Sequence, residues 1–133
     1  MDLERGDIDL KDTTISNDPR GISISLENLH FEADKATLLS GDETRLDQIA
    51  TVLKRYPDRN ILILGHTAQV GTVESQVTLS VERARTIVDS LKKRGIEARR
   101  LLFEGRGGSE PIADNSTEQG KAQNRRVQII ILD

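Results

Sequence analysis

The feature that most constrains the fold is an apolar run at residues 61–64, followed by a long amphipathic segment at residues 74–94. Four consecutive apolar residues indicate a strand that is covered on both faces. The following segment repeats apolar residues at helical spacing and ends in basic residues and Gly95, which favours a capped helix. We expect its core-facing stripe to consist of Val77, Val81, Ala84, Ile87 or Val88, and Leu91. A strand that leads into a helix predicts a layer that binds its ligand outside the carboxyl end of the strand.

The rest of the chain predicts a second main helix and three further strands. Alternating apolar residues at 22–26 indicate a half-buried strand, and short apolar runs at 101–104 and 127–132 indicate two more. A helix is expected to begin near residue 42 and to end before Pro57, because the residue before a proline avoids the helical conformation. This order predicts an α+β domain of β-α-β-α-β-β topology, with two main helices packed on one face of a small, mixed, four-stranded sheet.

The chain of 133 residues is long enough for one domain. Residues 1–20 are polar and show no sustained periodicity, so we expect a linker or a loosely ordered arm there and a folded domain over residues 21–133. No apolar run approaches the length of a membrane span, and the charged N-terminus lacks the apolar core of a signal peptide. We therefore expect no direct membrane insertion by this chain.

Composition argues against several classes of function. The absence of cysteine excludes disulfides and thiolate metal sites. The two histidines, His30 and His66, lack a third ligand at metal spacing, and Ser80 has no evident base beside it, so we expect no metal, no cofactor and no enzyme activity. The net charge is −3 and the aromatic residues are one tyrosine and two phenylalanines, which argues against nucleic-acid binding.

Four short motifs occur in a fixed order along the chain. They are G-H-T-x-x-x-G at 65–71, L-S-x-x-R-A at 79–84, G-x-G-x-x-x-P at 105–111 and N-R-R-V at 124–127. In combination they resemble the OmpA-like domain family over about residues 22–133. The resemblance implies non-covalent binding of peptidoglycan by a periplasmic domain that anchors an outer-membrane or other envelope protein to the cell wall. It allows other envelope proteins as further partners.

Arg83 is the leading candidate for a binding residue. It precedes a core-facing alanine and should lie on the flank of the helix near the sheet, where a planar guanidinium suits bidentate capture of a carboxylate. In the family that this chain resembles, the matching arginine contacts the carboxylate of diaminopimelate in the stem peptide of peptidoglycan. The resemblance further implies peptide hydrogen bonds from Thr67 and Gln76 and an apolar contact from Leu79.

Position 68 departs from the family pattern. The family has an aspartate there that accepts the ammonium of the same diaminopimelate, whereas Ala68 accepts nothing; the loss corresponds to about 1–3 kcal/mol. Three explanations of Ala68 are open. The stem peptide of the ligand has a different residue at its third position, or another acid supplies the negative charge, with Asp34 as the first candidate and Glu32 as the second. In the third explanation, binding is weakened or lost. The alternative function is a protein-interaction or assembly module that keeps the fold without peptidoglycan binding.

The remaining motifs favour structural roles. We expect Asn115 and Asn124 to hold loop backbone and Gly120 to end a turn. The glycine-rich stretch at 105–108 is followed by neither Lys-Ser/Thr nor a helix, so it predicts a turn rather than a phosphate-binding loop.

Overall fold

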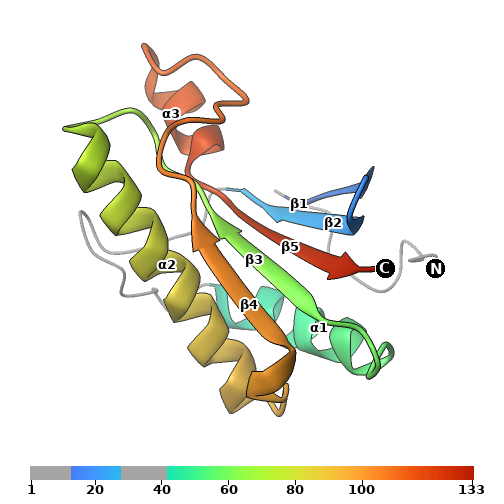
Figure 1. Cartoon of the computed structure of the whole chain (residues 1–133). Coiled ribbons are helices and arrows are strands. Elements are labelled where there is room, and N and C mark those ends of the chain that lie inside the picture. The colour runs from blue at the N-terminus through green and yellow to red at the C-terminus, as the bar shows by residue number, and fades with distance from the viewer. Residues whose placement is uncertain (1–12, 28–41) are drawn as a thin grey trace.

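A mixed five-stranded sheet forms the centre of the protein (Figure 1). The computed structural model describes residues 13–27 and 42–133. The strands are β1 (Thr13–Asp18), β2 (Gly21–Leu26), β3 (Ile61–Gly65), β4 (Leu101–Gly105) and β5 (Val127–Leu132), and the helices are α1 (Glu43–Lys54), α2 (Val73–Lys93), the short 3-10 helix η2 (Ala98–Arg100) and α3 (Glu118–Asn124). The spatial order of the strands is β1-β2-β5-β3-β4.

The sheet combines antiparallel and parallel pairing. β2 and β3 both pair antiparallel with β5, whereas β3 and β4 pair in parallel. The parallel pair follows from the chain path, because α2 carries the chain back along the sheet between β3 and β4. The mixed sheet predicted from the lengths of the connections is confirmed.

Helices α1 and α2 cover one face of the sheet (Figure 1). Alternate residues of the three inner strands point into that layer, including Ile24 of β2, Ile63 of β3 and Ile129 of β5, all fully buried. They pack against the apolar stripes of both helices, which include Leu46, Ile49, Leu53, Ala84, Ile87 and Leu91. The predicted α+β class, with two main helices on one face, is confirmed.

The sheet has five strands where the sequence predicted four. Residues 13–18 form β1, which pairs antiparallel with β2 from Thr13↔Leu26 to Asp18↔Gly21. The prediction of a linker or loosely ordered arm over residues 1–20 is therefore wrong for residues 13–18. Residues 1–12 lie outside the described residues. The pattern was missed because an edge strand needs few apolar residues, and here Ile15 alone is an apolar side chain packed against the core.

The buried face of α2 also differs from the predicted stripe. Ala84, Ile87 and Leu91 are buried as expected, but Val77 is 40% exposed and Val81 is only partly buried. In the first half of the helix the buried residues are polar, namely Gln76, Ser80 and Arg83. The reason is that this half packs on strand ends and turns rather than on the apolar centre of the sheet.

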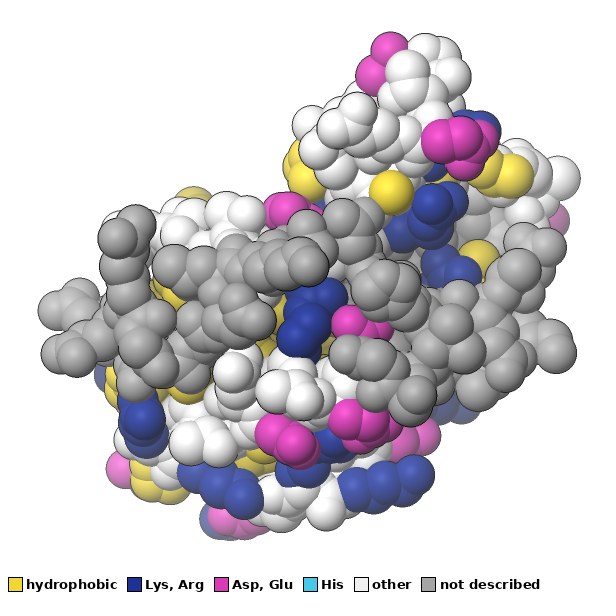
Figure 2. Space-filling view, turned by 180° about the vertical axis from the view of Figure 1, so that it is seen from behind, with side chains coloured by type: hydrophobic (Ala, Val, Ile, Leu, Met, Phe, Trp, Pro, Cys, Tyr) yellow, Lys and Arg dark blue, Asp and Glu magenta, His cyan; other side chains and the backbone are white. Residues whose placement is uncertain are grey.

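A lobe formed by α3 and the loop before it projects beyond the sheet (Figures 1 and 2). Figure 2 also shows acidic and basic side chains interspersed along the edge of the described surface far from this lobe. Among the described helices, none has both the length and the apolar character needed to cross a membrane.

Candidate ligand-binding site

The carboxyl ends of β3 and β4 meet beside the first turns of α2. The main chain joins the two loops there, since the amide of Thr67 donates to the carbonyl of Gly107 at 2.9 Å and that of Arg106 donates to Gly65 at 2.9 Å. This is the edge of a parallel strand pair where α/β layers bind ligands. The sequence predicted a binding site at this edge of the sheet. In the structure the loops after β3 and β4 and the helix α2 meet there.

Two glycines let α2 lie close to the strand ends. A Cβ atom added at Gly65 would lie 2.2 Å from the carbonyl oxygen of Ser80, and one at Gly105 would lie 2.5 Å from its Oγ. The Ser80 hydroxyl accepts from the amide of Gly107 at 2.9 Å and donates to the carbonyl of Val77 at 2.7 Å. The serine of L-S-x-x-R-A therefore holds the turn after β4, as expected for a glycine-rich structural turn.

Three of the predicted binding residues lie on α2. Gln76 and Arg83 are seven residues apart on the same buried face, with exposed fractions of 8% and 7%. The side-chain amide of Gln76 donates to the carbonyl of Gly71 at 3.1 Å, which joins the helix to the loop after β3. Leu79 is partly buried between them along the helix.

The other predicted binding residues lie in the loop after β3 or outside the described residues. Thr67 and Ala68 are each 5% exposed. The hydroxyl of Thr67 is buried and has no hydrogen-bond partner within residues 13–27 and 42–133. Asp34 lies outside the described residues, so its assignment as the ammonium partner stays a prediction.

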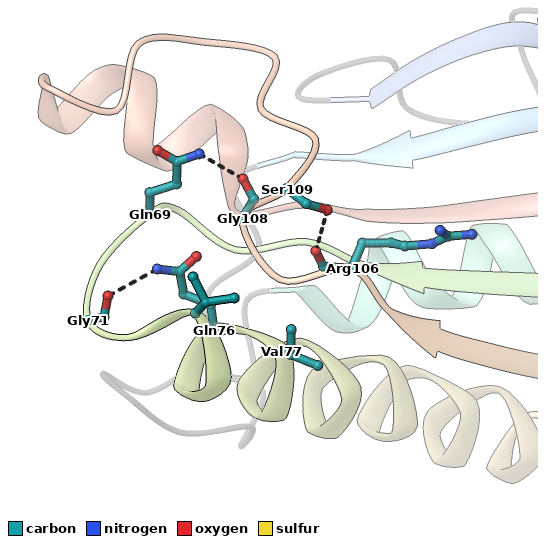
Figure 3. Close-up of a pocket in the computed structure, with 8 residues that line it drawn as sticks. Gln69, Gly71, Gln76, Val77, Arg106, Gly108 and Ser109 are labelled. Carbon is teal, nitrogen blue, oxygen red and sulfur yellow. Dashed lines mark hydrogen bonds between the residues drawn. The ribbon is translucent and has the colours of Figure 1, made fainter.

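A cavity of about 520 Å³ lies beside Gln76, between the start of α2 and the turn after β4 (Figure 3). It is lined by residues of the loop after β3, the start of α2 and the turn after β4: Gln69, Gly71, Val73, Gln76, Val77, Arg106, Gly108 and Ser109. Sequence reasoning named only Gln76 among these residues as a site residue. Val77 was not predicted to line a cavity, because the helical spacing assigned it to the core-facing stripe, whereas it is 40% exposed.

Two asparagines link the α3 lobe to this site. The side-chain oxygen of Asn124 accepts from the amides of Ile112 and Ala113 at 2.7 and 3.0 Å, and that of Asn115 accepts from the amide of Gln69 at 3.1 Å. Asn124 also donates to Asn115 at 2.9 Å. The predicted role of both asparagines in holding loop backbone is confirmed.

Gly120 has a different role from the one predicted. It lies inside α3 rather than at the end of a turn, and an added Cβ atom would lie 1.8 Å from the carbonyl oxygen of Asp114. Glycine is required there because the helix packs directly on loop backbone.

His66 lies at the carboxyl end of β3 and is 2% exposed. Its Nε2 is 2.7 Å from Oε1 of Gln128, whose own amide donates to the hydroxyl of Ser23 at 3.2 Å. This network assigns the proton to Nε2, and Nδ1 is buried without a partner among the described residues. Burial, together with the charge of Arg126, lowers the pKa of His66 to about 4. The imidazole is therefore neutral at physiological pH.

No group of three or more His, Asp or Glu side chains that could hold a metal ion occurs within the part of the chain that the structure describes. The functional groups at this edge of the sheet are a guanidinium, amides, hydroxyls and valines. They suit recognition of a peptide or carboxylate by hydrogen bonding and apolar contact.

Comparison with known proteins identifies the family. The sequence profile of the OmpA family matches residues 30–125. The chain is 32% identical to the probable lipoprotein YiaD of Escherichia coli K12, over 93% of this chain and 62% of YiaD. It is 37% identical to the peptidoglycan-binding protein ArfA of Mycobacterium tuberculosis H37Rv, over 76% of this chain and 31% of ArfA. The chain thus spans less than two thirds of these relatives.

Solved structures agree with this match. An outer membrane protein from Borrelia burgdorferi B31 superposes with a TM-score of 0.76 at 33% identity, covering 91% of this chain and 97% of that one. The peptidoglycan-associated lipoprotein of Burkholderia pseudomallei superposes with a TM-score of 0.71 at 30% identity, covering 80% and 87%. The chain belongs to the OmpA family, as the four motifs predicted.

Proposed function

We propose that this domain binds peptidoglycan non-covalently and anchors a larger envelope protein to the cell wall from the periplasm. Membership of the OmpA family supports the proposal, as do a relative named as a peptidoglycan-binding protein and a structural neighbour named as peptidoglycan-associated. The domain covers 62% of YiaD and 31% of ArfA, which is consistent with a part of a longer protein.

The observation that carries the proposal is the buried guanidinium of Arg83 on the face of α2 that also bears Gln76. A guanidinium in low-dielectric surroundings binds a carboxylate more strongly than one in water, and its planar fork matches the two oxygens. Arg83 is the proposed partner of the stem-peptide carboxylate, with Leu79 as its apolar neighbour.

Thr67 and Gln76 are the proposed hydrogen-bonding residues. The Thr67 hydroxyl is buried and unpaired among the described residues, so a ligand that reached it would remove a cost of about 1–3 kcal/mol. No covalent bond is made or broken. Many weak contacts along one polymer add through avidity, so a modest affinity at each site is enough for an anchor.

Ala68 is the residue of the proposed site that departs from the family pattern. Three accounts remain: a ligand with another third residue, an ammonium partner from elsewhere such as Asp34, or weakened binding. Since Arg83 is retained, we favour continued binding to the cell wall.

Sedimentation with purified sacculi of two wall types, with and without diaminopimelate, tests the proposal. Titration with the matching stem peptide then follows. We expect the protein to sediment with at least one type. If the folded protein sediments with neither, the proposal is wrong, and the alternative of a protein-interaction or assembly module replaces it.

A further inference from the structure

The cavity beside Gln76 has the position and size of a ligand site. It lies outside the carboxyl ends of β3 and β4, the one parallel pair among the described strands. Its volume of about 520 Å³ falls within the range of about 300–1,000 Å³ that is usual for ligand pockets.

One wall of the cavity is apolar. Val73 and Val77 lie one turn apart at the start of α2 and are 74% and 40% exposed. Figure 3 shows Val77 directed from the helix toward the turn after β4. Covering a valine side chain gains up to about 1.5–3 kcal/mol, so these two residues supply an apolar contact for small side chains of a ligand.

The opposite wall is polar and fixed in position. The side-chain amide of Gln69 donates to the carbonyl of Gly108 at 2.9 Å, and that of Gln76 donates to Gly71 at 3.1 Å. Each side-chain amide still has its oxygen as an acceptor and a second N–H as a donor for a ligand. Gly108 preserves the space, because a Cβ atom there would lie 2.5 Å from Oε1 of Gln76.

The described lining of the cavity suits an uncharged occupant. Arg106 is the one charged residue among the described residues that line it, and Figure 3 shows its guanidinium directed away from the cavity. That guanidinium pairs instead with Glu104 at 3.0 Å. A neutral occupant with N–H donors and small apolar groups matches such a lining, and a peptide main chain with methyl side chains has both.

The cavity lies within reach of a ligand bound by Arg83. Seven residues of helix separate Gln76 from Arg83, which corresponds to about 10 Å along the axis. An extended peptide covers that distance in about three residues. One peptide can therefore contact both places.

We propose that this cavity is a second subsite for the stem peptide, and that it binds the uncharged alanine residues that follow the residue held by Arg83. The inference rests on the proposed function and specifies which part of the ligand the domain recognises besides the carboxylate. The affinity of the domain then depends on the length of the peptide.

Titration with two synthetic stem peptides tests this inference. One is a tripeptide that ends at the diamino acid, the other continues for two alanine residues, and both are amidated at the C-terminus. We expect the wild type to bind the longer peptide about five- to tenfold more tightly, the equivalent of one or two covered methyl groups. The double variant Val73→Ser/Val77→Ser should bind both peptides with the tripeptide affinity.

Val70→Ser is the matched control, because Val70 lies in the loop just before α2, is 58% exposed and does not line the cavity. It should keep the preference for the longer peptide. Gly108→Ala, which narrows the cavity from the other wall, should remove it, with melting temperatures recorded for every variant.

Equal affinity of the wild type for the two peptides, or a preference that survives in the double variant, would overturn the subsite alone. Failure of the wild type to bind the tripeptide would overturn the proposed function as well. A gain in affinity from an attached disaccharide, with none from the added alanines, would assign the cavity to the glycan strand instead.

Discussion

At the scale of single residues, we expect position 68 to affect the charge of the proposed site. Ala68 is 5% exposed, at the position where the resemblance to the OmpA-like family predicts an aspartate. Ala68→Asp should restore an ammonium partner and increase the affinity for a diaminopimelate stem peptide about tenfold, since a charge-assisted hydrogen bond contributes about 1.5–3 kcal/mol.

Val70→Asp is the control for position 68, because it adds the same charge to a residue of the same loop that is 58% exposed. Its affinity should stay near that of the wild type. If Ala68→Asp gives no gain, the site supplies its ammonium partner elsewhere or prefers a different peptide.

A second residue-scale prediction concerns His66 and acid stability. The folded protein holds the pKa of His66 at about 4, below its ordinary value of 6.5. Between these values the unfolded chain binds more protons than the folded one, so the free energy of unfolding falls as the pH falls from about 6.5 to about 4. The contribution is on the order of 1–3 kcal/mol.

His66→Gln removes this titration. Urea denaturation at pH 7.0 and 4.5 should show a smaller loss of stability for the variant than for the wild type. The two proteins share their carboxylates, so the difference reports on His66. Equal losses would mean that the histidine is solvated or already protonated in the folded state.

At the scale of secondary-structure elements, a buried arginine closes the end of α1. The guanidinium of Arg100 donates to the carbonyls of Leu53 and Tyr56 at 3.1 and 2.7 Å, and to that of Arg59 at 2.9 Å. These carbonyls include ones that no intrahelical donor can reach at a helix C-terminus. One side chain from η2 thus holds the turn after α1 against β4.

Arg100→Ala should lower the free energy of unfolding by about 2–4 kcal/mol, because it removes three hydrogen bonds that a buried, charged guanidinium donates. Arg99→Ala is the matched control, since the side chain of Arg99 is 82% exposed. Chemical denaturation of both variants measures the effect. Similar midpoints for the two would show that the carbonyls are solvated without Arg100.

Periodicity predicted the elements well. The expected helix at 74–94 is α2 at Val73–Lys93, and the strands predicted at 101–104 and 127–132 are β4 and β5. Each of these segments carries an apolar pattern of its own, so its local sequence was sufficient to predict the element. β1 carries a single apolar residue against the core and was not predicted, because its pairing with β2 stabilises it through main-chain hydrogen bonds.

The site was predicted less completely than the fold. The family motifs pointed to Arg83, Thr67 and Gln76, but the cavity beside Gln76 forms between segments that are nearly forty residues apart. One of its walls consists of glycine backbone and of amides whose orientation depends on long-range bonds, such as that from Gln69 to Gly108. No local pattern encodes such a surface.

At the scale of the whole molecule, β1 is part of the folded domain and not a linker. Ile15 packs against the core from the edge of the sheet and pairs with Ile24. Ile15→Ser should lower the free energy of unfolding by about 1–2 kcal/mol. Ser16→Ala, at an exposed neighbouring position, should change it little. Equal stabilities in urea denaturation would mean that residues 13–18 form a loose arm after all.

The whole domain combines a sheet layer, two covering helices and one edge at which the loops and α2 meet. The proposed function depends on binding of the cell wall by Arg83, and a matched pair of arginines on α2 tests it. Arg83 is 7% exposed on the inner face, whereas Arg85 is exposed and stacks over Phe103 at 5.5 Å.

The most direct measurement is sedimentation of Arg83→Gln and Arg85→Gln with purified sacculi, beside the wild type and after circular dichroism has shown that both variants are folded. The account predicts at least a tenfold loss of binding for Arg83→Gln and no change for Arg85→Gln, since one charge-assisted pair contributes about 1.5–3 kcal/mol. Wild-type binding by Arg83→Gln, or equal losses in both variants, would contradict it.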